Sequence, residues 1–325
     1  MPAAGRSPFD SSSGAGSVGG SLPDTSASPD PAAGDAFRLP MPVITGCPRS
    51  GTSLLAVMLD SHSQVAMPPE TVFLNSMERL PGSGDSLRRN FFHLVTCDQA
   101  RISNWSDLDM DKEEFRRRLD GVRPFSVTRG LRAFYAQYAQ RFGKPRCGEK
   151  TPTTNAVYVA KLLPEAHFLH IIRDPRDTVL SLRRTWFGGA QDVASIAKTW
   201  VHRVAAGRAA SRSVGHYHEL RYEALVHSPE RVLRAVCVFL ALEFEPGMLD
   251  YGARGAARIA SLTTRTAADG KVVATREERA SIHANLALPP LSERVGCWER
   301  ELNADERRSI EAVAGPLMRE LGYET

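Results

Sequence analysis

The feature that most constrains the fold is a strand–loop–helix unit between residues 41 and 60. An apolar run, 41–45, leads into a short loop that Gly46 and Gly51 bound. The residues that follow, 51–60, repeat leucine and methionine at the spacing of one helical stripe. A buried strand that feeds a helix through a tight loop is typical of parallel sheets with helices on both faces.

The rest of the chain continues this alternation of strands and helices. Strands are predicted at 65–67, 147–150, 167–172 and 216–221, and helices at 153–163, after 177, and at 193–214, 229–240 and 304–321. Residues 71–145 are predicted to be mostly helical, with helices at 111–119 and 127–142 and a polar break at 81–85. The sequence therefore predicts one α/β domain, 39–325, whose parallel sheet carries a helical insertion at about 71–145.

Residues 1–38 have a different composition from the rest of the chain. Ser, Ala, Gly and Pro make up 26 of these 38 residues, which favours a disordered tail because few side chains there can be buried. No apolar run follows the start, so we expect the tail not to act as a signal peptide. No stretch approaches the roughly 18 apolar residues that a membrane-spanning helix needs. We therefore expect no membrane span.

Charge and cysteine content narrow the function classes. The net charge is +4, which is too small and too dispersed to indicate a nucleic-acid partner. The basic residues are 35 Arg and only 6 Lys, an excess that favours planar contacts to phosphate or sulfate oxygens or reflects a biased genome composition. The five cysteines form no C-x-x-C motif. They predict reduced thiols in a cytoplasmic protein, without a zinc site.

The loop at 46–53 has the layout of an anion-binding loop but lacks one residue of the nucleotide-triphosphatase pattern. That pattern reads G-x-x-x-x-G-K-[ST], and Gly46, Gly51 and Ser53 fit it. Thr52 stands where the phosphate-binding Lys belongs, and the nearby cation is Arg49, inside the loop. The loop is therefore interpreted as an anion site whose positive charge lies within the loop, before the helix begins. An ordinary strand-to-helix turn is the alternative.

Two motifs resemble those of the sulfotransferases that use 3′-phosphoadenosine 5′-phosphosulfate (PAPS). Residues 48–53, Pro-Arg-Ser-Gly-Thr-Ser, are similar to that family's 5′-phosphosulfate loop. Arg173, at a predicted strand end, and Ser181, eight residues on, are similar to the pair that holds the 3′-phosphate. The likeness runs from about residue 41 to the C-terminus and is closest to the bacterial and tyrosylprotein-sulfotransferase-like branches. It implies a sulfotransferase fold with a P-loop-like parallel sheet, PAPS as sulfuryl donor, and no metal.

The spacing of the second motif makes physical sense. Asp174 can cap a helix and Pro175 suits its first turn, which places Ser181 roughly 9 Å along the helix axis. A guanidinium at the strand end and this hydroxyl can then hold one phosphate from two sides. The alternative for Arg173 is an ion pair with Asp174 or Asp177.

The resemblance assigns further residues to the PAPS site. Tyr222 lies in 220–225, which is similar to the family segment whose tyrosine lies near the adenine, although Ala224 replaces an Asp of that segment. A core tyrosine is the alternative. Arg294 lies in an Arg-Val-Gly run similar to the segment that closes over PAPS. The PAPS-binding residues implied are Arg49, Ser50, Gly51, Thr52, Ser53, Arg173, Ser181, Tyr222 and Arg294.

Sulfuryl transfer needs a base for the acceptor hydroxyl and positive charge for the leaving phosphate. The resemblance implies Glu70 as the base, and His62, in an Asp-x-His segment, is the rival, which we interpret as structural. Arg49 would contact the phosphate and sulfate oxygens as the leaving group forms. Lys150 resembles a second family lysine, and a solvated Lys150 paired with Glu149 is the alternative.

Two function classes stay open at this point. The first is a sulfotransferase whose acceptor carries a hydroxyl: a small molecule, a sugar, a lipid or a protein tyrosine. The second is another P-loop nucleotide-binding protein, either a kinase-like transferase or a binder of a phosphorylated ligand. The loops in 71–145 and 262–290 are expected to shape the acceptor pocket, and the sequence does not indicate which acceptor fits it.

Overall fold

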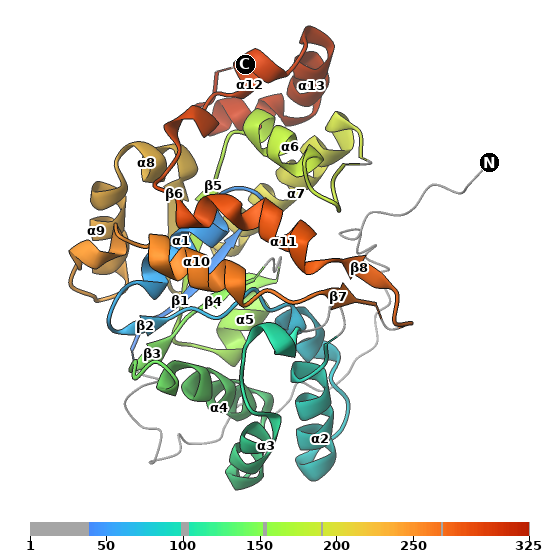
Figure 1. Cartoon of the computed structure of the whole chain (residues 1–325), viewed down its shortest axis with the longest axis vertical. Coiled ribbons are helices and arrows are strands. Elements are labelled where there is room, and N and C mark those ends of the chain that lie inside the picture. Colours follow the sequence, from blue (N-terminus) through green and yellow to red (C-terminus); the bar gives the residue numbers. More distant parts are fainter. Residues whose placement is uncertain (1–38, 99–103, 152–154, 190, 268, 325) are drawn as a thin grey trace.

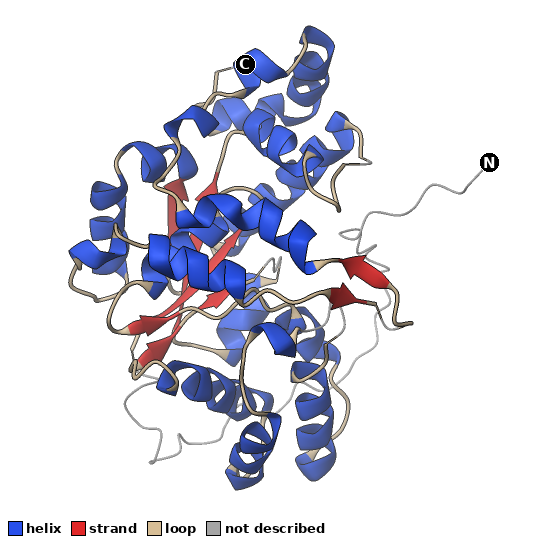
Figure 2. Cartoon of the chain, viewed as in Figure 1, coloured by secondary structure: helices blue, strands red, loops and turns tan. Residues whose placement is uncertain are grey.

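The centre of the fold is a parallel sheet of four strands in the order β4-β1-β5-β6. The computed structural model describes residues 39–98, 104–151, 155–189, 191–267 and 269–324, so the predicted disordered tail lies outside it. The strands are β1 (Met41–Gly46), β4 (Glu149–Lys150), β5 (Ala166–Ile172) and β6 (Tyr217–Arg221). In register, Ile44 of β1 pairs with Lys150 on one side and Leu169 on the other. The predicted α/β class, with helices around a parallel sheet, is confirmed (Figure 2).

Both faces of the sheet are covered, which explains why its strands are nearly continuous apolar runs. On one face, Val43 and Phe168 pack with α5 (Ala156–Leu162). On the other, Ile44 and Leu169 pack with α1 and α9. The bounds of these two helices are Thr52–Asp60 and Pro229–Phe239. The alternation along each strand therefore divides the core into two layers.

A group of helices lies between β2 (Val65–Ala66) and β3 (Arg146–Cys147) in the sequence. These two strands pair with each other as a separate two-stranded parallel sheet. Its members are η2 (Phe73–Arg79), α2 (Gly84–Val95), η3 (Trp105–Asp107), α3 (Lys112–Gly121) and α4 (Val127–Gln140). Aromatic side chains fill its interior, with Phe115 in contact with Phe91, Trp105 and Phe134. This helical group lies at the lower end of the molecule in Figure 1.

The C-terminal half of the chain is mostly helical. Besides β6 and α9, its elements are α6 (Pro175–Arg183), α7 (Val193–Ala210), α8 (Tyr222–His227), η4 (Pro246–Met248), α10 (Gly252–Ala260), β7 (Arg265–Thr266), β8 (Val272–Ala274), α11 (Arg276–His283), η5 (Ala284–Ala287), η6 (Ser292–Arg294), α12 (Trp298–Glu301) and α13 (Ala304–Glu320). Figure 1 shows α10 and α11 crossing in front of the sheet. Among the residues described, no helix combines the length and the apolar character that crossing a membrane requires.

Two sequence predictions differ from the structure. The single strand expected at 147–150 is divided into β3 and β4, which belong to different sheets. Gly148 lies between them, where a Cβ would come within 2.2 Å of the Met67 sulfur and 2.8 Å of Pro42. The segment 262–290, expected as loops, contains the β7–β8 hairpin and α11. Part of the helix predicted from 153 falls on residues outside the described ones, and α5 begins at Ala156.

Candidate functional site

The loop between β1 and α1 is built around two residues in left-handed backbone conformations. Arg49 has φ of 70° and Gly51 has φ of 97°. A Cβ on Gly51 would lie 2.4 Å from Cδ2 of Tyr222, so the position requires glycine. No side chain caps the N-terminus of α1. The first N–H groups of the helix are therefore left for an anion.

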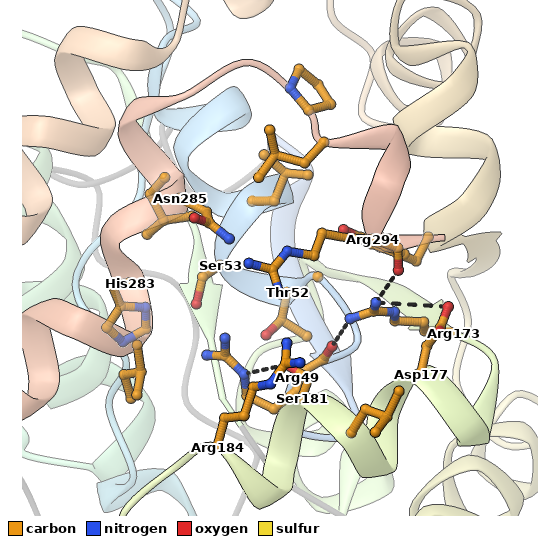
Figure 3. A pocket seen from close by; sticks show the side chains of 18 of the residues that line it. Arg49, Thr52, Ser53, Arg173, Asp177, Ser181, Arg184, His283, Asn285 and Arg294 are labelled. Atoms are coloured by element: carbon orange, nitrogen blue, oxygen red, sulfur yellow. Dashed lines mark hydrogen bonds and ion pairs between the residues drawn. The ribbon is translucent and has the colours of Figure 1, made fainter. Parts of the chain in front are cut away.

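A pocket of about 260 Å³ opens at this helix N-terminus. Figure 3 shows Arg294 reaching across it toward Ser53, with Arg173 at one side and His283 at the other. Eight residues that the sequence assigned to the PAPS site line it: Arg49, Gly51, Thr52, Ser53, Arg173, Ser181, Tyr222 and Arg294. Ser50 does not line it, being fully buried with a hydroxyl that has no partner among the described residues.

Arg173 fixes the geometry of the pocket wall from the end of β5. Its Nη1 donates to the backbone oxygen of Arg49 at 3.2 Å and its Nη2 to that of Arg294 at 2.5 Å. Its guanidinium lies over the ring of Tyr222, 4.4 Å from the centroid. The ion pair considered as an alternative exists as well, because Nη2 lies 3.8 Å from Asp177. Arg173 thus both braces the fold and lines the pocket.

Ser181 lies on α6 as the spacing predicted, and it contacts Arg49 rather than Arg173. Its Oγ accepts a hydrogen bond from Nε of Arg49 at 3.0 Å. Asp174 caps α6 through the N–H of Arg176, also as predicted. Burial and the nearby charge of Arg173 lower the pKa of Arg49 to about 10. Arg49 therefore stays a cation at neutral pH, but one held in a strongly positive environment.

Asp177 holds the segment that follows η6, a role that the sequence analysis missed. Its two carboxylate oxygens accept from the backbone N–H of Gly296 at 2.8 Å and of Trp298 at 3.0 Å. The thiol of Cys297 donates to the same carboxylate. The position one helical turn beyond Arg173 was the available signal, but it was interpreted only as an ion-pair partner. Asp177 ties Arg294 and its neighbours to α6.

Glu70 and Lys150 form an ion pair beside the pocket. Nζ of Lys150 lies 2.6 Å from Oε2 of Glu70 and 3.3 Å from Oγ of Ser53, which lines the pocket. Burial alone would raise the pKa of Glu70, but the charge and hydrogen bond of Lys150 outweigh it and hold the pKa at about 2. The alternative for Lys150 is wrong: it is buried and pairs with Glu70, not with Glu149.

The contacts of His62 give it a structural role. It is fully buried and absent from the pocket wall. Its Nδ1 accepts from the N–H of Gln64 at 3.0 Å, so Nε2 carries the proton and donates to the backbone oxygen of Glu243 at 2.8 Å. The neighbouring Asp60 accepts from the N–H of Met67 at 2.8 Å. The Asp-x-His segment therefore braces the end of α1.

The sequence analysis missed several pocket residues, among them the polar side chains of His283, Asn285 and Arg184. His283 ends α11, Asn285 follows in η5, and Arg184 directly follows α6. Burial, Lys150 and Arg49 lower the pKa of His283 to about 3, so its ring is neutral at physiological pH. No local pattern marks these positions.

Thiol and metal chemistry find no support in the described site. Burial raises the pKa of the Cys47 thiol to about 12, which removes it as a nucleophile. None of the five cysteines forms a disulfide with another described residue. Within the described ranges, no group of three or more His, Cys, Asp or Glu side chains is arranged to hold a metal ion.

Comparisons with known proteins agree with this fold. The model of the sulfotransferase family matches residues 40–246. The nodulation protein NoeE of Sinorhizobium fredii is 26% identical over 316 residues, with 88% of this chain and 67% of that protein covered. A protein-tyrosine sulfotransferase of Drosophila melanogaster is 28% identical over 225 residues, with 66% and 40% covered. The chain thus spans only part of the length of these relatives.

Two solved structures share the fold. The sulfotransferase domain from the curacin biosynthetic pathway gives a TM-score of 0.54 at 19% identity, covering 88% of this chain and 98% of that one. The sulfotransferase domain of the Synechococcus PCC 7002 olefin synthase gives 0.50 at 22% identity, covering 85% and 94%. The resemblance inferred from the motifs is confirmed: the chain belongs to the sulfotransferase family.

Proposed function

We propose that the protein transfers a sulfuryl group from PAPS to an acceptor hydroxyl. The observation that carries this proposal is the position of Ser53. It stands in the first turn of α1, lines the cationic pocket and contacts Lys150, which in turn holds Glu70. A carboxylate thus lies beside the anion-binding pocket, where an acceptor would meet the anion.

The residues of the pocket fit a nucleotide with several anionic groups. Arg49, Arg173 and Arg294 present three guanidinium groups, and Nε of Arg173 is buried without a partner among the described residues. The aromatic ring of Tyr222 adds a flat apolar surface. By the family resemblance, the loop 49–53 would hold the 5′-phosphosulfate, and Arg173 with Ser181 would hold the 3′-phosphate.

PAPS would supply a sulfuryl group, whose sulfur forms a bond to the acceptor oxygen as its bond to the 5′-phosphate oxygen breaks. Glu70 would accept the proton of the acceptor hydroxyl. Arg49 would stabilise the charge that develops on the phosphate oxygen, and it does so as a fixed cation because it cannot act as an acid there. Lys150, which contacts both Glu70 and Ser53, would be shared between the base and the sulfuryl oxygens.

The resting ion pair makes Glu70 a weak base. A pKa near 2 keeps the carboxylate ionised over the whole physiological range, but it reduces the affinity of Glu70 for a proton. We infer that anionic sulfuryl oxygens draw the charge of Lys150 away from Glu70. The basicity of Glu70 then increases when PAPS is bound.

The proposal defines the acceptor only by its chemical class, a molecule that carries a hydroxyl group. Some relatives of this chain are named protein-tyrosine sulfotransferases, which makes a protein tyrosine one acceptor to test beside sugars, lipids and small molecules. A panel of these four acceptor types with radiolabelled PAPS would assign the class.

The test of the function is thermal unfolding in the presence of two nucleotides. We expect 3′-phosphoadenosine 5′-phosphate (PAP) to raise the unfolding temperature, since a ligand at 100 times its dissociation constant adds about 2.7 kcal/mol of stability. Mg-ATP should give no such shift, because Thr52 replaces the lysine that binds its β- and γ-phosphates. Stabilisation by Mg-ATP alone would favour the kinase-like reading and refute the proposal.

A further inference from the structure

Glu149 and Lys150 are neighbours on β4, an edge strand of two residues, and their side chains point in opposite directions as strand geometry requires. Lys150 contacts Glu70 at 2.6 Å. Glu149 contacts Thr71, whose hydroxyl donates to Oε2 at 2.9 Å. Residues 149 and 150 therefore hold residues 70 and 71. Lys150 contacts the carboxylate of Glu70, and Glu149 contacts the hydroxyl of Thr71.

The second of these contacts is the more deeply buried. Glu149 and Thr71 are 0% and 3% exposed. Tyr135, from α4, donates its hydroxyl to the same oxygen of Glu149 at 2.8 Å. The other oxygen, Oε1, has no partner among the described residues, and none of their cations forms an ion pair with Glu149. A buried carboxyl with an unused oxygen destabilises a fold, so its presence calls for a specific reason.

We propose that Glu149 is a positioning residue, which anchors Thr71 and so holds Glu70 in place when Lys150 turns toward bound PAPS. The catalytic part of this inference rests on the proposed function. The Lys150–Glu70 ion pair cannot hold Glu70 in place alone. Lys150 also contacts Ser53 at 3.3 Å, and it is the group that sulfuryl oxygens would attract. The Thr71–Glu149 contact is independent of that exchange, since neither residue lines the pocket.

The charge state of Glu149 suits this task. Burial raises its pKa to about 8, although the hydrogen bonds from Tyr135 and Thr71 oppose the shift. The other ionisable groups that face it are Glu70, Lys150 and Cys147. At neutral pH the side chain is thus mainly a neutral acid, which accepts hydrogen bonds without competing with Glu70 for the charge of Lys150.

The experiment compares amide hydrogen exchange and steady-state kinetics in four variants of the full chain. Thr71→Val removes one donor, Glu149→Leu removes the acceptor, and Glu149→Gln keeps a neutral acceptor of the same shape. Tyr217→Phe is the control, because like Thr71→Val it removes a hydrogen-bonded hydroxyl, one that lies on β6 and contacts His170 of β5. Exchange is read by mass spectrometry on peptides that cover residues 70–75.

We expect exchange in 70–75 to accelerate roughly tenfold in Thr71→Val and Glu149→Leu, the loss of about one buried hydrogen bond, and to stay unchanged in Glu149→Gln and Tyr217→Phe. We also expect kcat to fall at least tenfold in the first two variants, while the KM for PAPS and the affinity for PAP change less than twofold. Unchanged exchange in folded Thr71→Val and Glu149→Leu overturns the inference, whatever the activity. Absence of sulfuryl transfer by the wild type overturns the proposed function instead, and exchange still decides the positioning role.

Discussion

The strongest energetic prediction concerns the replacement of Glu149 by Gln. The folded protein holds the proton of Glu149 more tightly than the unfolded chain, because the pKa is raised from 4.5 to about 8. The stability that this proton contributes is fully present below pH 4.5, and it is lost as the pH rises through 8. An amide of the same shape binds no proton, so Glu149→Gln does not take part in this loss.

The expected size follows from the two pKa values. Between pH 5 and pH 8 the wild type should lose about 3 kcal/mol relative to Glu149→Gln, at 1.36 kcal/mol for each unit of pKa. Groups that titrate equally in both proteins cancel in the difference. Any constant cost of the amide, whose nitrogen takes the place of the unpartnered Oε1, is the same at both pH values.

The assay is urea unfolding of both proteins at pH 5 and pH 8, followed by circular dichroism. Glu306→Gln is a matched control, because the pKa of Glu306 is lowered by its hydrogen bond from Asn303 and by Arg183. That carboxylate is ionised throughout the interval, so its variant should show a pH-independent difference. A difference for Glu149→Gln that changes by less than about 1 kcal/mol between the two pH values would refute the reasoning.

Three further predictions follow from the site. Glu70→Gln should lower kcat by roughly 10²- to 10⁴-fold, the contribution of a general base, with PAP affinity unchanged in calorimetry. Asp177→Asn should release residues 294–298 and weaken PAP binding, and limited proteolysis should cut that segment faster. Gly51→Ala should destabilise the protein by about 1–3 kcal/mol in urea unfolding, because of its φ of 97° and the 2.4 Å approach to Tyr222. Gly215→Ala is its control, since nothing lies within 4 Å of the added methyl, and equal losses in both glycine variants would contradict the argument.

The sequence predicted the features that local patterns encode. The run 41–45 and the glycines of the loop predicted β1 and the start of α1, since burial on both faces and a tight turn each leave a local mark. The capping by Asp174 and the place of Ser181 followed from helix geometry in the same way. The sheet at the centre of the fold could be predicted for these reasons.

Features that depend on contacts between distant segments could not be predicted. Nothing near Gly148 indicates that Met67 approaches it, so the separation of β3 from β4 was missed. His283 reaches the pocket because α11 crosses the carboxyl ends of the strands, and Asp177 acts on residues more than 100 positions away. The role of Glu149 was missed because its partner Tyr135 belongs to a helix that the sequence placed but could not orient.

The central claim is that this pocket binds the nucleotide of PAPS. The most direct measurement is calorimetric titration of PAP into the wild type and Arg173→Ala, with Arg183→Ala as a control on the exposed side of α6. We predict micromolar binding to the wild type and to Arg183→Ala, and binding at least ~10-fold weaker to Arg173→Ala, the effect of one charge-assisted hydrogen bond. No binding of PAP to the wild type would contradict the account and would mean that the loop after β1 serves another anion.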